Sequence, residues 1–187
     1  MEKNTCILIG EQTLLVQCGD LLLNNDFVIS SVISTNPRIG EWAESLAIPR
    51  FDSAQEWLAE TLKDAEYPPI DYLFSITNLR LLSDEFISSA RKLAINFHDG
   101  LLPDYAGLNT PVWALLAGEK SYGVTWHVME KNVDAGDILK QQHFSVEADE
   151  TAFTLNAKCY QAGLESFAGL IEDIRSSNLQ RQKQDVS

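Results

Sequence analysis

The sequence predicts an α/β domain: a mostly parallel, twisted sheet with helices on both faces and an antiparallel edge. Three observations support this fold class. Apolar and β-branched runs alternate with segments of helical periodicity through the first hundred residues. The connections between them are short, which favours right-handed crossovers and parallel neighbours. After residue 120, the strand-like segments alternate apolar and polar residues, as is typical of antiparallel pairing at an edge.

The first part of the chain is expected to alternate strands and helices, beginning and ending with a strand. Short apolar or β-branched runs predict strands at 6–9, 27–33, 48–51, 72–76 and 92–97. Helical spacing of apolar residues predicts helices at 12–24, 39–46, 54–63 and 83–90. Asp52 or Ser53 is a suitable N-cap for the third helix, whose expected apolar face is Trp57, Leu58 and Leu62.

The second part of the chain has a different pattern. We expect a helix over 110–118, strands over 123–129 and 138–146, and a long amphipathic helix over 150–176. The turn-rich stretch KNVDAGD joins the two strands. Residues 177–187 are polar and are expected to form a linker or a frayed end, which leaves residues 1–176 as one domain.

Composition excludes several classes of protein. The 187 residues are enough for one domain with its own core. A formal net charge of −13 argues against a nucleic-acid partner, because such affinity depends on Lys and Arg neutralising phosphates. No apolar stretch approaches the roughly 18–20 residues that span a bilayer, and the N-terminal residues do not form a signal peptide. We therefore expect a cytoplasmic protein without a membrane partner, in which the scattered Cys6, Cys18 and Cys159 are buried free thiols.

Common catalytic and phosphate-binding motifs are absent from the sequence. The turn after the first strand reads ILIGEQTLLV, with one glycine beside an acidic residue, so neither GxxxxGK[ST] nor GxGxxG is present. There is no HExxH, no GxSxG and no aspartate cluster suited to magnesium. We expect no metal and no dinucleotide or phosphorylated substrate bound at that turn.

One group of polar residues remains. Asn96 and His98 end the last strand of the first part, where open sheets bind ligands, and residues two apart on a strand project to the same side. Asp134 or Asp137 of VDAGD supplies a carboxylate. Acyl transfer to an amine needs such a set: an oxyanion donor contributes about 3–4 kcal/mol, and a positioned base roughly 10²–10⁴-fold. By composition alone, a loop histidine with capping Asp and Asn is the stronger interpretation.

The stretch NFHDGLLPDYAGLNTPVWALLAGEKSYGVTWHVMEKNVDAGDILKQ resembles the core of the folate-dependent formyltransferase family. It contains, in order, Asn-x-His followed by Leu-Leu-Pro, a Gly-Val-Thr strand and an Asp-x-Gly segment. The resemblance implies a Rossmann-like formyltransferase fold, a catalytic domain over 1–176 and 10-formyltetrahydrofolate as cosubstrate. It assigns the catalytic roles to Asn96, His98 and Asp134, and makes Asp137 the less suitable carboxylate.

The resemblance also implies what these residues do. Asn96 and His98 would polarise the formyl group and hold the oxyanion, while Asp134 would position His98 or a water and assist proton transfer. The expected folate-binding residues form two walls: Leu79, Arg80, Leu81 and Leu82, and then Lys131, Asn132, Val133 and Ala135. The expected substrate and lid residues follow His98: Asp99, Gly100, Tyr105, Leu108 and Asn109. Of these, Gly100 is expected to permit a tight turn, and Asp99 to cap or to meet the acceptor amine.

The acceptor distinguishes members of this family. Glycinamide ribonucleotide enzymes hold a phosphate on a Gly/Ser/Asn-rich loop that GEQTLLV lacks, and methionyl-tRNA enzymes carry a further C-terminal domain and a basic surface. The segments ILIGEQTLLVQCGDLLL and DYLFSITNLRLL are most similar to the N-terminal formylation domain of nonribosomal peptide synthetases. That resemblance implies formylation of the α-amine of an aminoacyl group on a carrier protein's phosphopantetheine arm, beside an adenylation domain, in natural product biosynthesis. Two alternatives remain: a sugar-nucleotide N-formyltransferase, and a catalytically silent module that binds folate or a carrier.

Three further side chains have structural interpretations. His127 lies on the GVTWHVM strand, opposite in direction to Trp126, and is expected to be structural rather than to line the acceptor pocket. His143 is expected to face solvent from its strand. Trp113 is expected to belong to the core, because it lies at helical spacing with apolar neighbours.

Overall fold

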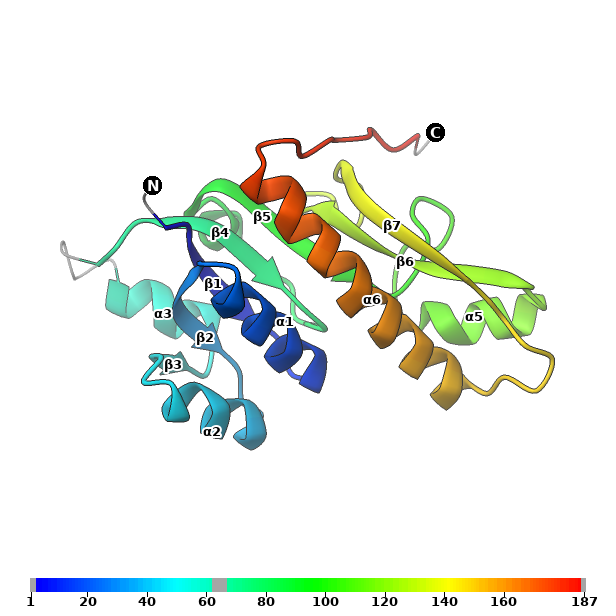
Figure 1. Cartoon of the computed structure of the whole chain (residues 1–187), viewed down its shortest axis with the longest axis horizontal. Helices are drawn as coiled ribbons and strands as arrows, with labels where there is room; N and C mark the ends of the chain where they lie inside the picture. Colours follow the sequence, from blue (N-terminus) through cyan, green and yellow to red (C-terminus); the bar gives the residue numbers. More distant parts are fainter. Residues whose placement is uncertain (1–2, 62–66, 186–187) are drawn as a thin grey trace. The chain divides into compact units, whose positions relative to one another are not determined.

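The structure is a computed structural model that describes residues 3–61 and 67–185 (Figure 1). The chain divides into two compact units, Met1–Ile95 and Asn96–Ser187. The strand order is β3-β2-β1-β4-β5-β6-β7, and β5 (Ala90–His98) contributes to both units. Strand β1 pairs in parallel with β2 and β4, and β2 pairs in parallel with β3, whereas β6 and β7 pair antiparallel. The predicted fold class, a mostly parallel sheet with an antiparallel edge and helices around it, is confirmed.

The first unit is built around β1 (Thr5–Ile9), which pairs with β2 (Val28–Ile33) and β4 (Ile70–Ser75). The short β3 (Arg50–Phe51) extends β2. All six residues of β4 are buried, as expected for a strand whose two faces are both covered. Gly10 follows β1 and has no room for a side chain, because a Cβ would lie 1.8 Å from the Ile76 carbonyl oxygen.

The helices of the first unit are α1 (Thr13–Asn24), α2 (Pro37–Ser45), α3 (Ala54–Thr61) and α4 (Asp84–Ile87). Helix α2 begins two residues before the expected position, because the Asn36 side chain caps it and proline occupies its first turn. Ser53, rather than Asp52, caps α3, since its hydroxyl accepts from the Glu56 amide. Helix α4 has a single turn because β5 already starts at Ala90. Residues 62 and 63, expected to end α3, lie outside the described residues.

The second unit contains α5 (Thr110–Ala117), β6 (Ser121–Val128), β7 (Ile138–Ser145) and α6 (Ala152–Arg175). Helix α6 packs on β6 and β7 (Figure 1). It begins with a capping box formed by Thr151 and Thr154. Trp126 of β6 points to α6, where its ring lies 4.6 Å from that of Phe167 and its indole nitrogen donates to Ser166. Because successive strand residues face opposite ways, Thr125 and His127 point away from α6.

The GVT sequence of β6 has a structural explanation at each position. A Cβ on Gly123 would lie 2.3 Å from the Gln142 carbonyl oxygen of the partner strand. Val124 is fully buried. The Thr125 hydroxyl donates to the Gly100 carbonyl and accepts from the Leu102 amide, so β6 holds the chain that follows β5.

Several simpler expectations are also confirmed. Cys6, Cys18 and Cys159 are buried and free, and His143 is exposed. The expectation for Trp113 is wrong, because 61% of this side chain is exposed on the outer face of α5. No helix in the described part of the chain is long and apolar enough to cross a membrane.

Candidate active site

Four polar side chains of the second unit meet beside the end of β5. Asn96 and His98 come from β5, His127 from β6, and Asp134 from the loop between β6 and β7. The Asn96 amide nitrogen lies 3.1 Å from His127 Nε2. Asp134 Oδ1 lies 3.7 Å from His98 Nδ1 and 3.6 Å from His127 Nε2. The three residues predicted to be catalytic are therefore brought together, and His127 is a fourth member that the sequence reasoning had assigned to structure.

His98 is buried, and its ring orientation follows from one hydrogen bond. Nε2 lies 2.5 Å from the Tyr105 carbonyl oxygen, which can only accept, so Nε2 carries a hydrogen. Nδ1 faces Asp134 Oδ1 at 3.7 Å. Gly100 does not have a positive φ, so its backbone does not require glycine. Glycine is needed because a side chain has no room: a Cβ would lie 3.0 Å from His98 Nε2 and 2.8 Å from the Tyr105 carbonyl oxygen.

His127 determines the orientation of the Asn96 amide. Its Nδ1 lies 2.9 Å from the Val128 carbonyl oxygen and must donate to it, so Nε2 is left as an acceptor. Burial lowers the pKa of His127 to about 4, although the Val128 hydrogen bond and Asp134 favour the charged form. The ring is therefore neutral at pH 7, and Asn96 must point its NH₂ group toward it. An NH₂ group has two hydrogens, which leaves one available for a ligand oxygen.

Asp134 has an unusual backbone conformation and a well-held carboxylate. Its φ of 56° lies in the left-handed region, which Asp and Asn tolerate better than most residues. The Gly107 amide donates to Oδ2 at 2.9 Å, while Oδ1 faces the two imidazoles. Asp137 instead closes the loop with its main chain, accepting from the Val128 amide at 2.9 Å. The structure thus brings Asp134 of the VDAGD segment to Asn96 and His98.

Gly136 explains the glycine of the Asp-x-Gly segment. A Cβ at this position would lie 2.0 Å from the Val128 carbonyl oxygen, the same oxygen that accepts from His127. The loop can therefore fold tightly against the end of β6 only with glycine here. This contact keeps the loop of Asp134 close to the end of the strand that carries His127.

The predicted lid residues surround the site in different ways. The Asp99 carboxylate and carbonyl both lie within hydrogen-bond distance of the Thr110 hydroxyl, which donates to them, and Asp99 caps no helix amide in the described contacts. The Tyr105 hydroxyl donates to Glu119 at 2.7 Å, and burial together with that hydrogen bond raises the pKa of Tyr105 to about 12. Leu108 is 67% exposed, and Asn109 precedes α5 with a left-handed φ of 57°. These positions are compatible with a cover over the site, and lid motion stays a prediction.

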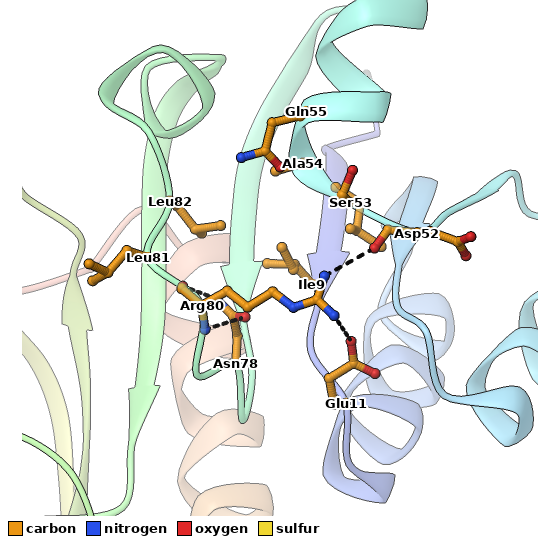
Figure 2. A pocket seen from close by; sticks show the side chains of 11 residues that line it. Ile9, Glu11, Asp52, Ser53, Ala54, Gln55, Asn78, Arg80, Leu81 and Leu82 are labelled. Atoms are coloured by element: carbon orange, nitrogen blue, oxygen red, sulfur yellow. Dashed lines mark hydrogen bonds and ion pairs between the residues drawn. The ribbon is translucent and has the colours of Figure 1, made fainter.

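The first predicted folate wall lies in the first unit, in the segment after β4. Figure 2 shows Arg80, Leu81 and Leu82 around a small hollow, with the Arg80 guanidinium directed at Glu11 and at the Asp52 carbonyl. The hollow has a volume of about 60 Å³, which corresponds to about two water molecules. Leu79 and Leu81 are 83% and 80% exposed, so their apolar side chains are available to a ligand.

The second predicted wall lies in the second unit, on either side of Asp134. Lys131, Asn132 and Val133 are exposed, and Ala135 is half-buried. Val133 presents 64% of its surface to solvent. Binding of folate by either wall stays a prediction. Among the residues that the structure describes, no group of His, Cys, Asp or Glu side chains is arranged to hold a metal ion.

Comparison with known proteins identifies the family. The model of the formyl transferase family matches residues 24–171, which include all four members of the site. The chain belongs to the formyl transferase family. Formyltransferases also have the same fold among solved structures.

Three of these solved formyltransferases differ in the share of their own length that aligns with this chain. Phosphoribosylglycinamide formyltransferase from Anaplasma phagocytophilum is 23% identical, with a TM-score of 0.82 over 100% of this chain and 97% of that one. An N-formyltransferase from Helicobacter canadensis, solved in complex with folinic acid and dTDP-3-aminofucose, is 23% identical, with a TM-score of 0.78 over 99% and 68%. A 4-N formyltransferase from Francisella tularensis is 24% identical, with a TM-score of 0.77 over 97% and 73%. At these identities the likeness establishes the fold and leaves the acceptor open.

His127 is the functional candidate that sequence reasoning missed. The signal was present in the alternation of β6: Trp126 faces α6, so His127 faces the opposite side. What the sequence did not reveal is that this side is the one where Asn96 and His98 lie. That depends on the pairing of strands far apart in the chain.

Proposed function

We propose that this formyl transferase family member moves the formyl group of 10-formyltetrahydrofolate to an amine. The observation that carries the proposal is the Asn96 amide, whose NH₂ group is turned toward His127 with one N–H left for a formyl oxygen. Such a donor, fixed before substrate arrives, stabilises the oxyanion of a tetrahedral intermediate by about 3–4 kcal/mol. The cosubstrate itself is supported by family membership and by the folinic acid in the Helicobacter canadensis relative.

His98 and Asp134 supply the proton handling. In the reaction, a bond forms between the acceptor nitrogen and the formyl carbon, the bond from that carbon to N10 of the folate breaks, and the amine proton ends on N10. Asp134 Oδ1 stands 3.7 Å from His98 Nδ1, so a small movement brings the two atoms into hydrogen-bond contact. Asp134 can accept the amine proton and pass it to His98, and the imidazole can then give one proton to the leaving nitrogen.

For the acceptor, we propose the α-amine of an aminoacyl group on the phosphopantetheine arm of a peptidyl carrier protein. The chain would then act as the initiating tailoring domain of a nonribosomal peptide synthetase, working with an adjoining adenylation domain. The resemblance in the first strand and in DYLFSITNLRLL supports this acceptor.

The turn after β1 argues against a phosphorylated acceptor there. Glu11 places its carboxylate against the start of α2, where it accepts from the Thr35 amide and hydroxyl and from the Ser34 hydroxyl. These groups, just before α2 and beside the turn after β1, are donors that a bound anion could use. A built-in carboxylate both occupies them and repels a phosphate, which disfavours a ribonucleotide acceptor at this place.

A sugar-nucleotide N-formyltransferase is the second candidate. The structural likeness to the Helicobacter canadensis enzyme with its bound dTDP-3-aminofucose favours it. A third possibility, from another class, is a catalytically silent module that binds folate or a carrier. The complete set of Asn96, His98 and Asp134 argues against this third function.

A comparison of three kinds of acceptor, each in a separate reaction, tests the proposal. The chain is incubated with 10-formyltetrahydrofolate and, in separate reactions, with aminoacyl carrier proteins, dTDP-3-aminofucose or glycinamide ribonucleotide. We expect an intact-mass gain of one formyl group on the carrier alone, and none with the His98→Ala variant. Formylation of the sugar instead would replace the proposal by the second candidate, and folate binding with no transfer to any acceptor would support the silent module.

A further inference from the structure

The tail after α6 returns to the loop that carries Asp134. Figure 1 shows the described tail, in red, running from the end of α6 past the start of β7. Gln182 and Ile138, the first residue of β7, exchange two main-chain hydrogen bonds of 2.9 and 2.8 Å, which form a one-residue antiparallel bridge. Ile138 is 7% exposed, so the tail crosses a covered part of the unit.

From this position, the Gln184 side chain forms two hydrogen bonds with the loop. Its side-chain nitrogen donates to the Asp134 carbonyl at 2.8 Å and to the Gly136 carbonyl at 2.6 Å. Both hydrogens of one NH₂ group are thus used on two carbonyls of the same turn. The other amide atom, Oε1, is buried without a hydrogen-bond partner in the described chain. Rotating the amide would set that oxygen against the two carbonyls, so its orientation is determined.

Apart from the Gly107 amide, which donates to the Asp134 carboxylate, the loop is held mainly on the side that faces β6. Asp134 holds a left-handed φ of 56°, which is less favourable than the ordinary conformations. Toward β6, the loop is fixed by Gly136 against Val128 and by the bond from the Val128 amide to Asp137. On its other side, residues 131–133 are exposed. Gln184 is the side chain that ties the Asp134 and Gly136 carbonyls to the tail.

We propose that Gln184 is a positioning residue of the active site, which holds the Asp134 carboxylate between His98 and His127 through the main chain of the loop. The inference rests on the proposed function, since the effect on turnover requires Asp134 to act in formyl transfer. It also makes residues 179–185 part of the working site, although their sequence resembles a linker.

Four variants test the role of Gln184. Gln184→Ala removes both hydrogen bonds, and we expect kcat for formyl transfer to the carrier to fall about tenfold, as for two modest hydrogen bonds. Gln184→Glu places an acceptor against two carbonyls, and we expect a larger fall. Gln184→Asn should recover less than half of the lost activity, because its side chain is one methylene shorter. Gln180→Ala is the matched control in the same tail, since the Gln180 side chain donates to Asn178 and, among the described residues, has no hydrogen bond to the Asp134 loop; we expect unchanged turnover.

A comparison of kcat with KM and with stability separates positioning from a general loss of stability. If Gln184 acts through the Asp134 carboxylate, Gln184→Ala should lower kcat about tenfold, while the KM for the carrier and for 10-formyltetrahydrofolate changes less than twofold and urea unfolding shows a fully folded chain under assay conditions. Unchanged turnover of Gln184→Ala, or a fall in turnover matched by an equal loss of folded protein, would overturn the proposal.

Hydrogen exchange distinguishes failure of this inference from failure of the proposed function. In Gln184→Ala, amides of 129–138 should exchange at least threefold faster than in the wild-type chain, with β4 amides of 70–75 unchanged. Faster loop exchange in a chain that transfers formyl to no acceptor would keep the structural role of Gln184 and refute the function. Unchanged loop exchange in an active chain would refute the role of Gln184 alone.

Discussion

The neutral state of His127 predicts a specific dependence of stability on pH. The pKa of His127 is about 4 in the folded chain, whereas an unfolded histidine titrates near ~6.5. Between these values the unfolded chain binds more protons, so the free energy of unfolding must fall as the pH drops from about 6.5 to about 4. From the two pKa values, the loss between pH 7 and pH 5 is about 2 kcal/mol.

The variant His127→Gln isolates this contribution. Glutamine does not titrate, and its Oε1 can reach the place of His127 Nε2 and accept from Asn96. Urea unfolding at pH 7 and pH 5 gives, for each protein, the change in the free energy of unfolding with pH, and the two changes are compared. We expect His127→Gln to lose about 2 kcal/mol less than the wild-type chain over this range. Parallel stability curves would refute the neutral, buried His127 and the amide orientation deduced from it.

Activity provides a second measure of the same residue. His127→Leu is buried and apolar but offers no acceptor, so the Asn96 amide is free to turn its oxygen toward the substrate. We expect kcat at pH 7 to fall between about tenfold, for a lost hydrogen bond, and about a hundredfold, for a largely lost oxyanion donor. His127→Gln should retain most of the turnover. Equal losses in the two variants would show that the acceptor atom has no role.

Three other predictions concern separate parts of the second unit. His98→Ala and Asp134→Ala should each abolish measurable formyl transfer with unchanged far-UV circular dichroism, and near-wild-type turnover of either would refute the mechanism. Gly136→Ala should lower the free energy of unfolding by about 1–3 kcal/mol, because its methyl group has no room; an unchanged urea midpoint would contradict this contact. Trp126→Ala should cost about 3–5 kcal/mol by the same measurement, whereas exposed His143→Ala should change it by less than about 0.5 kcal/mol; similar effects of both would contradict the packing on α6.

Much of the fold was predictable because hydrophobic periodicity is a local property of the sequence. The strands and helices were expected within a few residues of their observed bounds, and the exceptions have local causes. Helix α4 is shorter than expected because pairing draws Ala90 into β5. Helix α2 starts early because Asn36 caps it, a signal that was present in the sequence and was not used.

The active site was predictable only in part, because its geometry depends on contacts between distant residues. Asn96 and His98 could be paired from their spacing on one strand, and the family resemblance supplied Asp134. Nothing in the spacing indicated that His127 would meet Asn96 at 3.1 Å, since that contact joins two strands. The grip of Gln184 on the Asp134 loop was also hidden, because polar tails look alike whether they are bound or free.

The segment between β5 and α5 forms hydrogen bonds with two members of the candidate active site. The Tyr105 carbonyl accepts from His98 Nε2, and the Gly107 amide, two residues later, donates to the Asp134 carboxylate. If this segment swings outward to admit substrate, the imidazole loses the acceptor of its Nε2 hydrogen and the carboxylate loses a donor. Closure reverses both changes together. Movement of this one segment would therefore change the hydrogen bonds of His98 and of Asp134 at the same time.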